Sequence, residues 1–226
     1  MSQAIIAPAL FSFPAQARVA RVVPKSKIYE HGPVTSALRD RFVGQVEQIT
    51  WAYKLASETI NLPARGGVAE IQVFDITQKT SELDEDVLRA IDRAIPLPII
   101  FQLHHEQRTR MVAAFKRPSE ADGSKWVIDG YFAGNWLPAD SPRQALPVAL
   151  DLQGLYEQLL RGLLPCPARP GESLPEQLQR LNRLRSLQSE HAKFNARLLK
   201  EKQFNRKVVL NAKLREIQNE IADLSA

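Results

Sequence analysis

Three charged residues in the first half of the chain have the right chemistry for a metal-dependent nuclease. Glu70 lies in a strand-like segment, Asp92 in a helix-like segment and Lys116 in a later strand-like segment. Such an enzyme needs clustered carboxylates for Mg²⁺ and a lysine near the attacking water. Ile71 and Gln72 follow Glu70, so the acidic-x-Lys pair of many nucleases is missing. The sequence therefore favours a protein with no catalytic residues, in which Glu70 and Lys116 form a structural ion pair or lie as charges at the edge of a strand. The nuclease stays as the alternative.

Metal and cofactor motifs are weak in this chain. His104, His105 and Glu106 are consecutive, and adjacent strand residues point to opposite faces of a sheet, so they are poorly placed to share an ion. A single cysteine, Cys166, cannot form an internal disulfide or a cysteine-based zinc site. No glycine-rich phosphate loop followed by Lys-Ser/Thr is present. We therefore expect neither a metal nor a cofactor.

The basic charge of the chain is concentrated near its end. Residues 176–226 hold 11 Lys/Arg and 6 Asp/Glu, so this segment has a net charge of +5. The whole chain also has a net charge of +5, so residues 1–175 are neutral. A basic helix can contact DNA phosphates, in a salt-dependent way, or it can be a solvated face or bind an acidic protein. The DNA-binding candidates are Arg197, Lys200, Arg206, Lys207 and, nearer the N-terminus, Lys25.

An apolar seam with heptad spacing runs along the same segment. It has two phases, one ending at Leu198 and one starting at Leu210, and 12 residues separate them, which breaks the register. No Gly, Pro or Asp marks a turn between them, so one continuous helix with a stutter is favoured over an antiparallel hairpin. The residues predicted to mediate oligomerisation are Leu187, Phe194, Leu198, Phe204, Asn205, Val208, Leu214, Ile217 and Ile221.

The elements that must position these residues alternate between helix and strand. Apolar spacing predicts helices at 35–49, 81–95 and 151–164 and strands at 17–23, 68–77, 99–104, 110–116 and 126–136, with a polar turn at 119–124. The strand at 68–77 is apolar on both faces, which is typical of a central strand covered on both sides. The predicted fold is α+β, with a mostly antiparallel sheet and packed helices, followed by a long C-terminal coiled-coil helix.

Three regions follow from this pattern. Residues 1–165 form the α+β domain, residues 166–173 a proline-rich linker, and residues 174–226 the basic coiled-coil helix. The capping box of Ser173 and Glu176 marks where that helix begins. The N-terminus is a poor signal peptide and no segment is long and apolar enough to cross a membrane, so we expect a cytoplasmic protein without a membrane partner.

Aromatic residues on the predicted strands have two interpretations. Trp51, Trp126, Trp136 and Tyr131 could line a base-stacking surface, but aromatic side chains on strands more often fill a core. The core is the favoured interpretation.

The order of these motifs is similar to that of a known family. The matching stretches include Ile49-Thr50-Trp51, Glu70-Ile71-Gln72-Val73-Phe74, Tyr131-Phe132, Leu155-Tyr156-Glu157 and Glu201-Lys202-Gln203-Phe204-Asn205-Arg206-Lys207. On these residues the chain resembles the bacterial family catalogued as domain of unknown function 4391. The family brings no established catalytic residues.

What the resemblance implies is a context. Genes of this family look like companions of helicase and DNA methyltransferase genes in restriction-type and phage-defence clusters. We therefore expect a non-catalytic accessory or adaptor subunit of an anti-phage or restriction-modification-like complex. It would dock on a helicase or methyltransferase and form a homo-oligomer through its coiled coil, and its basic helix would contact the DNA backbone. The alternative is a Mg²⁺-dependent nuclease subunit of such a system.

Overall fold

The computed structural model describes residues 10–32, 34–118 and 126–225 and divides the chain into two compact units. The sheet unit spans residues 1–165 and the hairpin unit residues 166–226. The turn predicted at 119–124 lies outside the described residues.

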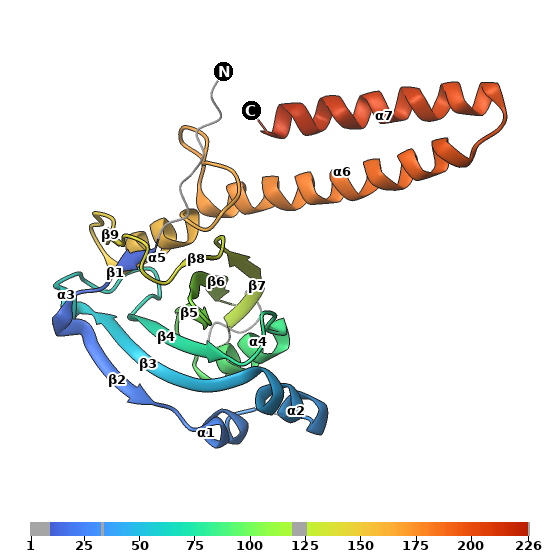
Figure 1. Ribbon diagram of the computed structural model, residues 1–226. Helices are drawn as coiled ribbons and strands as arrows, with labels where there is room; N and C mark the ends of the chain where they lie inside the picture. The colour runs from blue at the N-terminus through green and yellow to red at the C-terminus, as the bar shows by residue number, and fades with distance from the viewer. Residues whose placement is uncertain (1–9, 33, 119–125, 226) are drawn as a thin grey trace. The chain divides into compact units, whose positions relative to one another are not determined.

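The sheet unit is built on one mixed, mostly antiparallel sheet (Figure 1). Its strands, in spatial order, are β2 (Arg18–Val22), β3 (Val46–Ala56), β4 (Glu70–Gln78), β5 (Ile99–His105), β6 (Arg108–Pro118) and β7 (Trp126–Ala133). Strand β8 (Leu137–Pro138) pairs with β6, while β1 (Phe11–Ser12) and β9 (Gln144–Ala145) form a separate parallel pair. In the main sheet only β4 and β5 pair in parallel among the described strands, and α4 (Glu85–Ala94) connects them.

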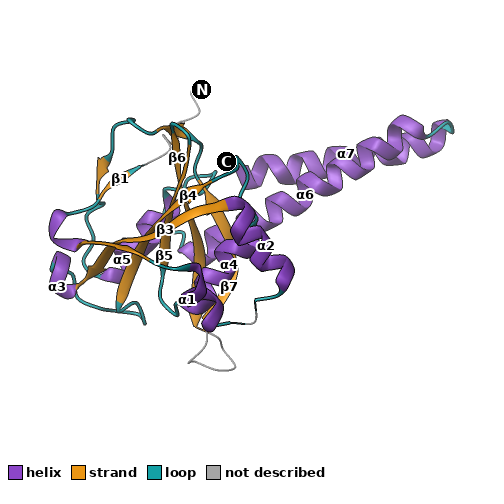
Figure 2. Cartoon of the chain, turned by 60° about the horizontal axis from the view of Figure 1, so that its bottom comes forward, coloured by secondary structure: helices purple, strands orange, loops and turns teal. Residues whose placement is uncertain are grey.

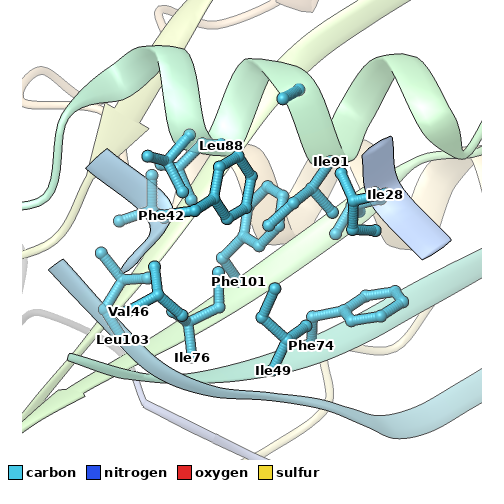
Figure 3. Packing of buried hydrophobic residues seen from close by; sticks show 14 residues of the cluster. Ile28, Phe42, Val46, Ile49, Phe74, Ile76, Leu88, Ile91, Phe101 and Leu103 are labelled. Carbon is cyan, nitrogen blue, oxygen red and sulfur yellow. The ribbon is translucent and has the colours of Figure 1, made fainter. Parts of the chain in front are cut away.

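Strand β4 lies inside the sheet and is buried on both faces, as its sequence predicts. On one face, Phe74 and Ile76 pack in a cluster with α1 (Lys25–Glu30), α2 (Ser36–Gln45) and α4. Figure 3 shows Phe42 of α2 and Ile91 of α4 meeting over the strands. On the other face, α5 (Leu152–Arg161) contacts β4 and β6.

Several predicted elements have different bounds. The predicted helix at 35–49 ends at Gln45, and Val46 and Ile49 of its apolar stripe belong to β3 instead. The helix ends there because the chain becomes rich in β-branched and aromatic residues, which pack well on a sheet. The helix predicted from residue 81 begins only at Glu85, because the carboxylate of Asp84 accepts the backbone amide of Asp86. Helix α1 and the short helices α3 (Ser57–Ile60) and η1 (Ala15–Ala17) were not predicted.

The other predictions for this unit agree closely with the structure. The strands predicted at 99–104 and 110–116 form the antiparallel β5–β6 pair, and the strand at 17–23 is β2. The region 126–136 contains β7, and the helix predicted at 151–164 is α5.

The hairpin unit consists of two antiparallel helices, α6 (Leu174–Lys200) and α7 (Phe204–Ser225), which run side by side in Figures 1 and 2. The prediction of one continuous helix is therefore wrong, and the hairpin alternative holds. Glu201 adopts an extended conformation and its carboxylate accepts the backbone amides of Lys202 and Gln203. These hydrogen bonds hold the turn between α6 and α7 without Gly, Pro or Asp. The capping box of Ser173 and Glu176 begins α6 as predicted.

The apolar seam is filled within the chain over the lower part of the hairpin. Leu187 on α6, and Leu214 and Ile217 on α7, are buried. Polar contacts also link the two helices, between Arg183 and Glu220 at 2.6 Å and between His191 and Gln218 at 3.1 Å. These residues therefore stabilise an intramolecular helix pair.

Candidate functional site

The end of the hairpin where α6 passes into α7, residues 197–210, is the most unusual surface of the described chain, and we call it the hairpin tip. Five of its side chains are basic and only Glu201 is acidic. The basic ones are Arg197, Lys200, Lys202, Arg206 and Lys207. The tip therefore combines four of the five DNA-binding candidates from the sequence.

The single acidic group of the tip serves the turn itself. Hydrogen bonds from the amides of Gln203 and Lys202 lower the pKa of the Glu201 carboxyl, and nearby Arg206 and Lys207 lower it further. The Arg206 guanidinium lies 4.0 Å from this carboxylate. Because one carboxylate faces five cations, the tip keeps a strong positive charge.

A groove of about 580 Å³ lies at the tip. Basic side chains from both helices line it, as do apolar ones, and Leu210 is half-buried there. The lining residues are Arg197, Lys200, Glu201, Asn205, Arg206, Val209 and Leu210. The groove is thus a mixed surface, able to take a group that is anionic on one side and apolar on another.

Apolar side chains become exposed toward the tip. Leu187 is 1% exposed in the lower hairpin, whereas Leu199 is 80% and Phe204 77% exposed at the tip. Val208 and Val209 are also exposed. Burial of large apolar groups is normally favourable by about 1.5–3 kcal/mol each, so these exposed side chains would gain free energy from contact with a partner.

Several basic residues of the hairpin form ion pairs, and others form none within the described residues. In the lower hairpin, Arg180, Arg183 and Lys213 form ion pairs with Glu172, Glu220 and Glu216. At the tip, Lys200, Lys202 and Lys207 form no ion pair within the part of the chain that the structure describes. The sequence alone could not separate these groups, because the separation depends on which helix faces which.

A buried arginine fastens the base of the hairpin. The Arg180 guanidinium donates to both oxygens of the Glu172 carboxylate at 2.7 and 2.9 Å, to the carbonyl of Pro167 at 2.8 Å and to that of Leu224 at 2.9 Å. Hydrogen bonding to Arg180 lowers the pKa of Glu172 to about 2. This contact, which we call the Arg180 clasp, joins the segment before α6 to the end of α7.

The nuclease candidates separate into two places. The Lys116 ammonium lies 2.6 Å from the Asp92 carboxylate, and these side chains are 1% and 0% exposed. It also donates to the carbonyls of Leu97 at 2.6 Å and Ile95 at 3.2 Å, just beyond the end of α4. The hydroxyl of Tyr131 donates to the second oxygen of Asp92. Every strong partner of the pair is thus inside the protein.

Burial sets the ionisation of this pair. It raises the pKa of Asp92 and lowers that of Lys116, while their mutual attraction opposes both changes. A group that no substrate can reach is poorly placed to activate water. The geometry supports a structural role, in which Lys116 binds the carbonyls at the end of α4.

Glu70 has other partners than the predicted Lys116. Its carboxylate lies 2.8 Å from the Lys54 ammonium, which also lies 2.7 Å from Glu58, and it accepts a hydrogen bond from Gln72 at 2.8 Å. The sequence interpretation of a Glu70–Lys116 ion pair is therefore wrong. Lys116 does form a structural ion pair, but its partner is Asp92 and not Glu70.

The remaining candidates serve local structure. Lys25, in the sheet unit, donates to the carbonyl of Val46 at 2.5 Å. Burial lowers the pKa of Lys25, and the positive charge of nearby Lys79 lowers it further. His104 lies 3.5 Å from Asp75. No group of three or more His, Cys, Asp or Glu side chains that could hold a metal occurs among the described residues.

The aromatic residues of the sheet are largely packed. Trp51, Trp136 and Tyr131 lie partly buried against the apolar cluster, and the Arg110 guanidinium stacks 4.6 Å from the Trp136 ring centre. The side chain of Trp126 lies outside the described residues. The core interpretation thus fits the three side chains that the structure describes.

Family comparison covers both units. The family model described as Domain of unknown function (DUF4391) matches residues 11–221. The chain belongs to this family. The DUF4391 match includes the hairpin tip as well as the sheet, so the tip is part of the family's domain. The search of curated proteins and the search of solved structures each find no match. No described helix is long and apolar enough to cross a membrane.

Proposed function

We propose that this protein is a non-catalytic adaptor that contacts the nucleic-acid backbone through its hairpin tip. The observation that carries the proposal is the gathering of Arg197, Lys200 and Arg206, from two helices, around one open groove. Cationic side chains bind phosphates by releasing the counterions around them, and among these three Lys200 has no ion pair within the described residues. The sheet unit, whose residues carry no net charge, would then be free to dock on a protein partner.

The partner that we propose is a helicase or DNA methyltransferase of an anti-phage or restriction-modification-like complex. This follows from the resemblance described above and from the division of charge between the two units. Recovery of such an enzyme with the tagged protein from its bacterial host supports the proposal. Recovery of neither enzyme counts against the partner but leaves the DNA contact to its own test.

Fluorescence anisotropy with a labelled 20-base-pair duplex tests the DNA contact. The double variant Lys200→Glu/Arg206→Glu is compared with Lys213→Glu/Arg215→Glu, which makes the same change in net charge lower on α7. Loss of two phosphate contacts should reduce the slope of log K against log salt by about 2 in the tip variant, with a much smaller change in the control. Equal loss in both variants, or no binding by the unmodified protein, overturns the proposal.

A further inference from the structure

An aromatic ring stands exposed among the cations of the tip. Phe204 is the first residue of α7 and is 77% exposed, with Lys202 and Arg206 each two residues away in the chain. Phosphate contact alone gives no reason for a solvated phenyl ring at this position. Proteins that bind single-stranded nucleic acid combine a positive groove with aromatic side chains on which bases stack.

The groove at the tip, whose lining residues do not include Phe204, also offers chemistry beyond phosphate binding. Its Arg and Lys side chains suit phosphates, Asn205 offers amide donors and an acceptor, and Val209 and Leu210 add apolar surface. At about 580 Å³ it lies within the size range of small-molecule sites, which is enough for a nucleobase. A duplex backbone presents only phosphates and sugars, whereas a single strand also presents base faces.

We propose that the hairpin tip binds single-stranded nucleic acid, with a base stacked on Phe204 and the adjoining phosphates held by Arg197, Lys200 and Arg206. The inference rests on the proposed backbone contact and names its substrate class. Stacking on a ring tolerates any base, so the tip binds without sequence preference.

Charge disfavours a second copy of this chain as the occupant. Two tips face to face would bring together ten basic side chains and two acidic ones, since each tip has five and one. Like charges at close range repel, and the repulsion opposes the gain from burying Leu199 and Phe204. A polyanion removes this conflict. Besides nucleic acid, an anionic membrane surface also combines negative charge with apolar groups. The experiment below distinguishes these two ligands.

The experiment measures the affinity of the full-length protein for two labelled 20-mers at equal salt. One is oligo-dT and the other has the same backbone with tetrahydrofuran in place of every base. We expect the unmodified protein to prefer oligo-dT about tenfold, equivalent to about 1.4 kcal/mol. The variant Phe204→Ala should lose the preference, whereas Phe204→Trp should keep it.

Leu199→Ala is the matched control, because Leu199 is equally exposed at the tip but has no aromatic face. It should retain the preference for oligo-dT. Equal affinity of the unmodified protein for both 20-mers overturns the stacking inference while leaving the backbone contact intact. Tight binding to phosphatidylserine vesicles that is lost in Phe204→Ala, without binding to either 20-mer, overturns both proposals in favour of a membrane surface.

Discussion

Replacing Lys116 by Met is the sharpest test of how the sheet unit is held together. The substitution keeps most of the side-chain length but removes the ammonium that lies 2.6 Å from Asp92 and 2.6 Å from the Leu97 carbonyl. The Asp92 carboxylate, 0% exposed, keeps the hydrogen bond from the Tyr131 hydroxyl. A buried charge without its counter-charge is among the most costly defects in a core.

The size of the effect follows from that burial. Removing one partner of a buried pair typically costs about 3–5 kcal/mol, which corresponds to a fall in melting temperature of about 6–20 °C for a chain of this size. Lys54→Met is the control, because Lys54 and its two partners, Glu58 and Glu70, all remain in contact with solvent, so each pair contributes about 0–1 kcal/mol. The double variant Asp92→Leu/Lys116→Met should recover most of the loss, since apolar groups can replace a buried pair.

Tryptophan fluorescence during urea unfolding is the assay, because it reports on the sheet unit alone. All three tryptophans of the chain are at 51, 126 and 136, and none is in the hairpin unit. Circular dichroism at 222 nm records all helices in the same samples, and α6 and α7 supply the larger share of the described helical residues. The reasoning predicts a large shift in fluorescence and a smaller one in circular dichroism.

The pH dependence gives an independent check. Without Lys116 the pKa of Asp92, already raised by burial, rises further above its ordinary value of 3.8. When a carboxyl has a higher pKa in the folded than in the unfolded state, the free energy of unfolding of the protein decreases as pH rises. The deficit of Lys116→Met relative to the unmodified protein should therefore shrink as pH is lowered toward 3.8. If Lys116→Met and Lys54→Met unfold at the same urea concentration at pH 7, the structural role assigned to this pair is refuted.

Three further predictions concern single contacts. Arg180→Met should lower the melting temperature of the hairpin helices, measured by circular dichroism. Because the pKa of Glu172 is lowered to about 2, the Arg180 clasp stabilises the protein above pH 4.5, and this stabilisation is lost as pH falls toward 2. Glu201→Ala should cost about 1 kcal/mol through the lost amide hydrogen bonds yet tighten binding to duplex DNA, measured by anisotropy. Phe42→Ala, at a fully buried position, should cost about 3–5 kcal/mol by fluorescence-detected unfolding, and a loss under 1 kcal/mol would contradict the packing.

The sequence was most informative where one physical signal dominates. Apolar residues on both faces of residues 68–77 predicted an inner strand, and β4 is one. Repeated leucines predicted α5, and the Ser173 capping box predicted the start of α6. Charge counting located the basic unit, although it could not show which cations are paired.

Errors arose where two signals compete or where the decisive contact is distant in the chain. The apolar spacing around Val46 fits a helix and a strand equally well, and pairing with β4 decides for the strand. The break after Lys200 depends on the Glu201 side chain, which does not belong to the usual turn-forming residues. The assignment of Phe204 to an oligomer seam stays a prediction, because within the single chain the opposite helix leaves this side chain exposed.

The length of the hairpin also fixes a distance. With 27 residues at about 1.5 Å each, α6 extends about 40 Å from the clasp at its base to the tip. The protein could therefore act as a spacer that holds whatever binds the tip at a set separation from the base. Removing seven residues from each helix, in register, would shorten that reach by about 10 Å while keeping the same faces in contact. Fluorophores at the base and the tip would record the change directly.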